Sequence, residues 1–294
     1  MRVSQAVEDY LKHLASEQRS PHTVNAYRRD LSAFVRFTAR EKLYDLADIT
    51  PANLTAFMAS QEVRYSPIGR RRAPASVNRF RVALKALYAF LGARWLVDRN
   101  PTTILRCQRH RSLPPEVLTE NEIRQVLKFH YRGRTAGRDR ALITFMLLTG
   151  TRLAETVALN VGDIDLGTKT ALIREPKGGE PARIVLSDRV VAALRPVATR
   201  AHDDPLFRTG TRRLGCRQVQ RIVEQRLQEA GIERRLTPHG LRHTFATRLY
   251  NQTGDIRLVQ QALRHHHVTT SEQYCQVDPL RWRAAVNAGV MRRA

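Results

Sequence analysis

The chain has 294 residues, of which 42% are hydrophobic, so its length suits one large domain or two ordinary ones and its composition excludes wholesale disorder. No apolar run approaches the roughly 18–20 residues that a membrane span needs. Lys and Arg number 50 against 27 Asp and Glu, and the resulting net charge of +23 indicates a polyanionic partner.

Nucleic acid is the partner that this charge favours. A GC-rich genome raises the arginine content, but exchanging Lys for Arg leaves the net charge unchanged. An acidic membrane surface is the alternative, and no strongly basic amphipathic helix with a Trp, Phe and Leu face supports it. The three cysteines, Cys107, Cys216 and Cys275, are far apart and odd in number, so they indicate neither a disulfide framework nor a Cys-rich zinc site. With no apolar secretory segment at the start, a reducing cytoplasm is the expected compartment.

The first ninety or so residues predict a helical unit. Ser20 followed by Pro21 favours a helix over about 22–40, and Thr50-Pro51 favours another through Met58. A further helix is expected from Ser76, with one apolar face and one polar face. The basic loop before this helix and the helix's polar face supply five candidates for contact with nucleic acid, Arg70, Arg71, Arg72, Arg81 and Lys85.

A linker is expected over residues 93–116, between a first domain of residues 1–92 and a second of residues 117–294. The linker contains several prolines and, among its basic residues, Arg109 and Arg111. It either follows a phosphate backbone through these arginines or is a plain solvated connector, and both interpretations stay open.

The second domain is predicted to be mainly helical with a small β-hairpin. A helix over 138–148 is apolar enough to lie at its centre, and two strand-like runs, 170–174 and 182–186, flank a turn at 176–179. Further helices are expected over 188–200, 215–230, 239–250, 255–264, 269–276 and 279–291. The fold class is therefore mainly α with a small β-sheet or hairpin in the second domain.

Polar residues in four separate places, 149–155, 177, 239–244 and 263–274, are candidates for chemistry, and each place alone is weak evidence. Arg152 after a glycine is typical of a helix cap, and a tyrosine such as Tyr274 is more often a packed aromatic. Lys177 is the last lysine of a chain that mostly uses arginine, which suggests that a titratable ammonium is needed there. The histidines of 265–267 do not share a helix face, so no metal site is predicted.

Taken in order, these residues resemble the catalytic set of the tyrosine recombinases, and most closely that of the compact Xer-type enzymes and related integrases. The stretch from His239 to Arg248, His-Gly-Leu-Arg-His-Thr-Phe-Ala-Thr-Arg, is nearly verbatim a box of this family. The spacing of His265 and Tyr274 matches a second box, and the resemblance covers nearly the whole chain. The catalytic set that it implies is Arg152, Lys177, His239, Arg242, His265 and Tyr274.

The resemblance implies a role for each of these residues. Tyr274 would attack the phosphodiester and form a 3′-phosphotyrosine, with His239 as the candidate base. The two guanidiniums, of Arg152 and Arg242, suit the charge that develops on the non-bridging oxygens. Lys177 would protonate the leaving 5′ oxygen. In addition, His265 would hydrogen-bond the phosphate and Glu155 would orient Arg152 or its neighbours, and no metal or other cofactor is expected.

The resemblance also implies an architecture and partners. The two domains, a helical core-binding domain and a catalytic domain, would close around duplex DNA as a clamp, and four protomers would act on two synapsed recombination sites. The C-terminal helix, residues 279–291, would dock on a neighbouring protomer or pack on its own. A second recombinase or an accessory protein is a further expected partner. The chain begins with the core-binding unit, which favours dimer resolution or a mobile element over phage integration.

Three other functions remain as alternatives. A type IB topoisomerase shares this chemistry without exchanging partners, and a catalytically idle DNA-binding protein shares the fold. A basic RNA-binding protein is disfavoured because no aromatic RRM strand or KH loop is evident. One departure from the family pattern is Arg264, which stands where the second box usually has glycine.

Overall fold

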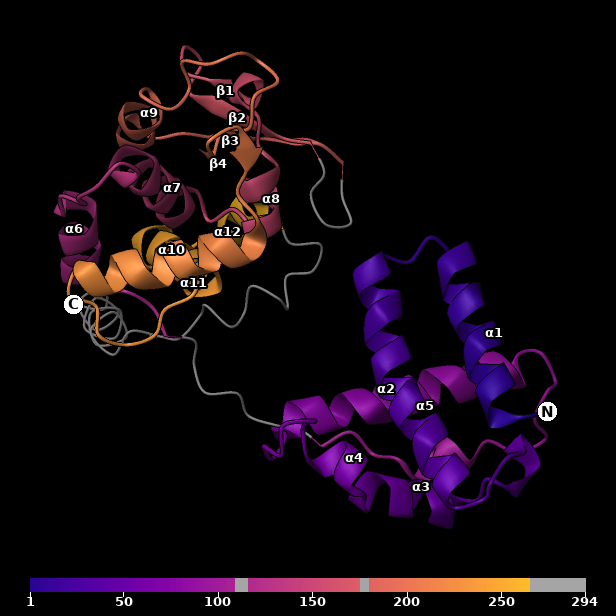
Figure 1. Ribbon diagram of the computed structural model, residues 1–294. Helices are drawn as coiled ribbons and strands as arrows, with labels where there is room; N and C mark the ends of the chain where they lie inside the picture. The colour runs from indigo at the N-terminus through magenta and orange to yellow at the C-terminus, as the bar shows by residue number, and fades with distance from the viewer. Residues whose placement is uncertain (109–115, 175–179, 265–294) are drawn as a thin grey trace, which may run out of the picture. The chain divides into compact units, whose positions relative to one another are not determined.

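The computed structural model describes residues 1–108, 116–174 and 180–264 (Figure 1). The chain divides into two compact units, Met1–Ser112 and Leu113–Ala294. The described residues are mainly helical, and their five short strands all lie in the second unit, which confirms the predicted fold class. None of the helices among them is long and apolar enough to span a membrane.

The first unit is a helical bundle with its own core. It consists of α1 (Val3–Ser16), α2 (Pro21–Arg40), α3 (Pro51–Ala59), α4 (Gln61–Arg64) and α5 (Pro74–Gly92), with short 3-10 helices at Leu46–Asp48 and Pro101–Ile104. Helices α1 and α2 pack on each other and both pack on α5. The aromatic rings of Phe34, Phe57 and Phe80 meet in the core, and Leu105 packs there as well.

Local capping chemistry explains where these helices begin. The Ser20 hydroxyl accepts a 3.2 Å hydrogen bond from the Thr23 N–H, as expected for the cap of α2. Helix α5 begins at Pro74, two residues before the predicted Ser76. Proline is favoured in the first turn because its fixed φ suits a helix and its missing N–H costs no hydrogen bond there.

The second unit surrounds one buried helix. Its helices are α6 (Glu120–Lys128), α7 (Ala136–Thr149), α8 (Leu153–Ala158), α9 (Asp188–Leu194), α10 (Cys216–Glu229), α11 (Pro238–Thr253) and α12 (Ile256–Leu263), with a 3-10 helix at Val161–Asp163. Residues 141–147 of α7 are all buried, and α7 packs on α9, α10 and α11 (Figure 1). The predicted central position of this helix is confirmed.

A three-stranded antiparallel sheet flanks these helices. It is formed by β1 (Ile164–Asp165), β2 (Thr170–Ile173) and β3 (Ala182–Val185), in which Ala171 pairs with Ile184. A second hairpin joins β4 (Arg208–Thr209) to β5 (Arg212–Arg213). The strands expected at 170–174 and 182–186 are therefore present. The turn at 176–179 and the helices expected at 269–276 and 279–291 lie outside the described residues.

Candidate active site

The turn between α7 and α8 places Arg152. Helix α7 ends at Thr149, and Gly150 follows it with a left-handed backbone at φ +61°. A Cβ atom at Gly150 would lie 2.4 Å from the ring of Phe245 on α11. Glycine is required here both by its backbone conformation and by this close approach. The turn thus joins α7, α8 and α11 at one place.

Buried threonine hydroxyl groups hold the same turn. The Thr151 hydroxyl lies 3.2 Å from that of Thr149 and 2.9 Å from that of Thr156. The Thr149 hydroxyl donates to the Phe145 carbonyl oxygen at 2.6 Å, and the Thr156 hydroxyl donates to the Arg152 carbonyl oxygen at 3.1 Å. Because buried hydroxyls linked in this way rigidify their surroundings, the backbone of Arg152 is fixed before any ligand binds.

Glu155 orients the side chain of Arg152. Its carboxylate accepts a 2.9 Å hydrogen bond from the Arg152 backbone N–H and a 2.7 Å bond from guanidinium Nη1. The Glu155 side chain is 2% exposed, whereas that of Arg152 is 25% exposed, so solvent reaches the guanidinium but not the carboxylate. Burial alone would raise the pKa of Glu155, but the Arg264 and Arg152 cations and the backbone N–H hold this pKa below its ordinary value.

Arg242 on α11 is buried beside this pair. Its Nη1 donates to the Gly150 carbonyl oxygen at 2.6 Å, and its Nη2 donates to the Leu263 carbonyl oxygen at 2.7 Å. The guanidinium therefore bridges the turn after α7 and the end of α12. Arg152 reaches the same end of α12, because its Nη2 donates to the Arg264 carbonyl oxygen at 3.3 Å. Arg242 and Arg152 are thus anchored on two consecutive carbonyl groups, those of residues 263 and 264.

His239 lies in the first turn of α11, which Thr237 caps through a 3.4 Å hydrogen bond from the Gly240 N–H. Burial, Arg242 and Arg152 lower the pKa of His239 in that order, so its imidazole is neutral at pH 7 and able to accept a proton. Its ring packs edge-on against that of His243, with centroids 4.3 Å apart. Burial first, and then His239 and Arg242, lower the pKa of His243 to about 4.

Arg264 completes the group of cations, although no site role was predicted for it. Its Nη2 donates to Glu155 Oε2 at 2.7 Å, so one buried carboxylate serves two guanidiniums. The residue follows α12 in a left-handed conformation, with φ +54° and ψ +49°. The departure from the usual glycine was the only sign of this role in the sequence, since the contact with Glu155 spans 109 residues of chain.

The structure brings together four of the predicted site residues, Arg152, Glu155, His239 and Arg242. The other three predicted members, Lys177, His265 and Tyr274, lie outside the described residues. Within the described ranges, no three His, Cys, Asp or Glu side chains are grouped so that they could hold a metal ion.

Four arginines of the first unit line a cavity of about 480 Å³. Three of them, Arg71, Arg72 and Arg81, were predicted to contact nucleic acid, and Arg64 was missed. No carboxylate of the described residues pairs with these four side chains. The start of α5 forms another wall, and the positive end of a helix dipole adds to the attraction for an anion.

Neighbouring contacts shape this basic cavity, which we define by Arg64, Arg71, Arg72 and Arg81. The Arg72 guanidinium lies 5.4 Å from the centre of the Phe80 ring, and Arg81 donates to the Asn78 side chain at 2.8 Å. The predicted contacts Arg70 and Lys85 are exposed but are not among its lining residues. Arg109 and Arg111 lie outside the described residues.

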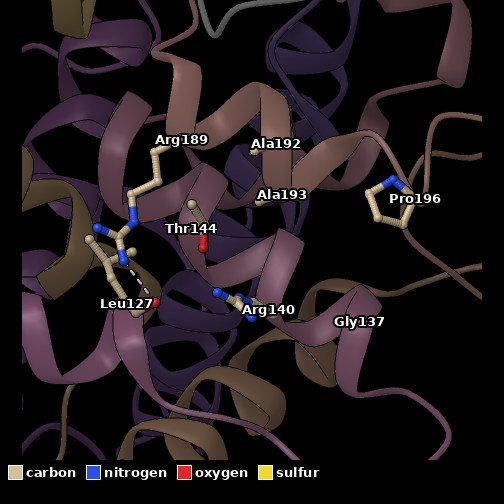
Figure 2. Close-up of a pocket in the computed structure, with 8 residues that line it drawn as sticks. All are labelled: Leu127, Gly137, Arg140, Thr144, Arg189, Ala192, Ala193 and Pro196. Atoms are coloured by element: carbon tan, nitrogen blue, oxygen red, sulfur yellow. Dashed lines mark hydrogen bonds between the residues drawn. The ribbon is translucent and has the colours of Figure 1, made fainter.

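Figure 2 shows a second hollow, of about 370 Å³, between α7 and α9. Arg140 and Arg189 are its two charged lining residues, and Arg189 donates a 2.9 Å hydrogen bond to the Leu127 carbonyl oxygen. None of the predicted site residues lines it, so the grouping of arginines and histidines described above is the better candidate for chemistry.

Family models match both units. A model described as the phage integrase family matches residues 116–281, and a model of the N-terminal SAM-like domain of phage integrases matches residues 7–94. The tyrosine recombinase XerC of Chromohalobacter salexigens is 34% identical, over 93% of this chain and 91% of that protein. The XerC of Mesorhizobium japonicum is 33% identical, over 94% of this chain and 92% of that protein.

Solved structures share the fold at lower identity. The XerH site-specific recombinase bound to a palindromic difH substrate, in a post-cleavage complex, has a TM-score of 0.74 with 24% identity, over 97% of this chain and 84% of that one. The Tn1549 transposon integrase in complex with transposon right-end DNA has a TM-score of 0.76 with 16% identity. The match covers 99% of this chain and 100% of that one.

Proposed function

Since this chain belongs to the phage integrase family and is a tyrosine recombinase that cleaves and rejoins DNA at specific sites, we propose that Tyr274 is its nucleophile. The phenol oxygen attacks a backbone phosphorus as the bond to the 5′ oxygen breaks, which leaves a 3′-phosphotyrosine and a free 5′ hydroxyl. Attack by a 5′ hydroxyl of the partner strand reverses these steps and rejoins the DNA. The energy of the phosphodiester is retained throughout, so the step needs no nucleotide cofactor.

The anchoring of both Arg152 and Arg242 on carbonyl groups at the end of α12 is the observation that carries this proposal. Two guanidiniums held before the substrate arrives suit a phosphoryl transition state, in which charge grows on the non-bridging oxygens. Arg152 keeps part of its surface open to solvent, so it can reach a phosphate directly. Glu155 supports this chemistry by orienting Arg152 rather than by reacting.

Proton transfer completes the proposed mechanism. A phenol has a pKa near 10, so it needs a base to attack at neutral pH. His239 suits this role because the lowered pKa of its imidazole keeps it neutral. Lys177 then protonates the leaving 5′ oxygen, and His265 hydrogen-bonds the phosphate, as the family resemblance implies for these two residues.

The basic cavity supports a proposal for how the first unit contacts DNA. Its four arginines and the start of α5 form a place for a backbone phosphate, beside which Arg70 and Lys85 are exposed. We expect Arg109 and Arg111 to contribute to the same attraction. Phosphate contacts of this kind position a protein on a duplex without reading its sequence, and they weaken as salt rises.

The larger assembly follows from the family and is likewise a proposal. Two domains close around duplex DNA as a clamp, and four protomers act on two synapsed sites in the cytoplasm. The C-terminal helix over 279–291 docks on a neighbouring protomer, and a second recombinase or an accessory protein assists. Chromosome or plasmid dimer resolution and the movement of a mobile element are the roles that suit this chain.

Trapping the covalent intermediate tests the nucleophile. The protein is incubated with supercoiled DNA that carries the flanking regions of its own gene, and with a library of genomic fragments, and SDS stops the reaction. We expect protein joined to DNA 3′ ends with the wild type and with Tyr44→Phe, which removes an exposed phenol of the first unit. Tyr274→Phe should give none. An adduct that survives Tyr274→Phe would identify another residue as the nucleophile.

The products on two copies of the mapped site test the exchange of partners. We expect recombinant molecules, together with a protein complex of four chains on the paired DNA after chemical crosslinking. Relaxed circles without recombinants would instead show a topoisomerase-like activity. Binding without any adduct on either DNA would show an idle DNA-binding protein.

A further inference from the structure

Arg264 occupies a backbone conformation that suits glycine. It caps the C-terminal end of α12 with φ +54° and ψ +49°, in the left-handed region where a Cβ atom crowds the backbone. The family box that this stretch resembles has glycine at the same place. A strained residue persists only where the surrounding structure holds it in place. The contacts of the Arg264 side chain are therefore expected to hold this residue in its left-handed conformation.

The side chain of Arg264 turns toward the candidate active site. Its Nη2 donates to Glu155 Oε2 at 2.7 Å, and its Nη1 donates to the Ala262 carbonyl oxygen at 3.2 Å. The side chain is 11% exposed and the Glu155 side chain is 2% exposed, so the pair is shielded from water. Shielding strengthens the ion pair and makes the loss of either partner costly.

Residue 264 also contacts Arg152 in two ways. Its carbonyl oxygen accepts from Arg152 Nη2 at 3.3 Å, and its guanidinium shares the Glu155 carboxylate with Arg152. With one arginine, Glu155 would neutralise Arg152. With both arginines present, the side chains of Arg152, Arg264 and Glu155 together carry one net positive charge. Arg152 therefore retains more of its attraction for a phosphate.

We propose that Arg264 is a positioning residue for DNA cleavage, which shares Glu155 with Arg152, fixes the direction of the Arg152 guanidinium and keeps the group cationic toward the reacting phosphate. This inference rests on the proposed function, because it assigns Arg152 to that phosphate. Arg264 acts through Glu155 and Arg152 and need not touch DNA.

The second unit contains a matched control for this arrangement. The Asp139 carboxylate on α7 is 2% exposed and is shared by Arg138 and by Arg226, whose side chain is 11% exposed. This group lies ten residues before Thr149, or about 15 Å along the helix. Arg226→Gln therefore removes an equally buried cation from a shared carboxylate at a distance from the candidate site.

Single-turnover cleavage of a duplex carrying the mapped site tests the inference. Arg264→Gly removes the cation while favouring the left-handed turn, so α12 should still end at the same place. We expect it to form the covalent adduct about tenfold more slowly, by analogy with the roughly 10–100-fold cost of removing a group that orients a metal ligand. DNA affinity, measured in the Tyr274→Phe background, should stay within about twofold, because positioning affects the reacting state more than ground-state binding. Arg264→Lys should recover at least part of the rate, and Arg226→Gln should leave the rate unchanged.

A double-mutant cycle separates positioning from a purely structural role or a direct contact with DNA. In the Glu155→Gln background Arg264 and Arg152 share no carboxylate, so only the charge of Arg264 is left to lose, and Arg264→Gly should slow cleavage by clearly less than about tenfold. A tenfold loss that persists in this background would overturn the inference, as would an unchanged rate for Arg264→Gly alone. If the wild type itself forms no adduct on any DNA, the proposed function fails. A wild-type adduct with no effect at residue 264 defeats only this inference.

Discussion

The Arg242 guanidinium donates a 2.6 Å hydrogen bond to the carbonyl oxygen of Gly150. This bond ties a buried cation of α11 to the left-handed residue that ends α7. The backbone conformation of Gly150 therefore sets the direction of the carbonyl that holds Arg242. Folding of the turn and placement of the arginine depend on the same residue.

The substitution Gly150→Ala should destabilise the second unit strongly. The added Cβ would be strained at φ +61° and would lie 2.4 Å from the Phe245 ring. We expect the free energy of unfolding to fall by about 2–4 kcal/mol, from strain and overpacking together, as measured by urea denaturation. Gly137→Ala in the same helix meets no atom within 4 Å and should leave stability unchanged or slightly raised. Similar losses for both variants would contradict this account.

Acid should destabilise the protein through His243. Burial first, and then His239 and Arg242, lower the pKa of His243 from the ordinary 6.5 to about 4. Between pH 4 and 6.5 the imidazole therefore gains a proton when the protein unfolds. The stability that depends on the neutral ring is present above pH 6.5 and is lost as the pH falls toward 4, by up to about 3 kcal/mol. Urea denaturation from pH 7.5 to 4 measures this loss. His243→Leu should reduce the slope, whereas His130→Gln, at an exposed position, should not.

Cleavage should depend on the protonation of His239. Burial and the cations Arg242 and Arg152 lower its pKa, so the cleavage rate should fall on acidification with a midpoint below 6.5. Single-turnover adduct formation from pH 5 to 8 gives this profile. His239→Asn should slow cleavage by about 10²–10⁴-fold and abolish the fall in the cleavage rate at low pH. A midpoint above 6.5, or a full rate in His239→Asn, would exclude this histidine as the base.

Arginines of the basic cavity should govern the salt dependence of DNA binding. Arg71→Gln and Arg81→Gln should each reduce the slope of log K against log salt by about 0.9 if each residue neutralises one phosphate. Filter binding in the Tyr274→Phe background measures the slope. Arg94→Gln removes the same charge beyond the far end of α5, whose last residue, Gly92, lies about 16 Å along the helix from Arg81, and it should leave the slope unchanged. Equal reductions in all three variants would indicate a general charge effect rather than a site.

Helix positions were predictable where local chemistry decides them. The cap at Ser20 and the apolar centre of α7 follow from neighbours in the sequence. The helix expected over 188–200 instead ends at Leu194, because Pro196 has no backbone N–H to continue the helical hydrogen bonds. Two-residue strands such as β4 leave no periodic pattern, and they exist only because a partner strand pairs with them.

The candidate site was predictable to the extent that residue types follow a family pattern. Arg152, His239 and Arg242 were assigned from the order and spacing of such residues, and the structure places them around the turn at Gly150. The link between Arg264 and Glu155 could not be inferred in this way. It depends on a left-handed turn and on a contact between residues 109 positions apart, and both are set by tertiary folding.

The buried clusters of the two units share no residue, since that of the first unit lies within residues 3–105 and those of the second lie within 118–263. Substitutions that alter packing in one cluster therefore leave the contacts of the other intact. Over evolutionary time, the half that carries the basic cavity and the half that carries the reactive arginines can change at different rates. For protein engineering, the same separation allows the buried core of one half to be redesigned without changing a residue of the other core.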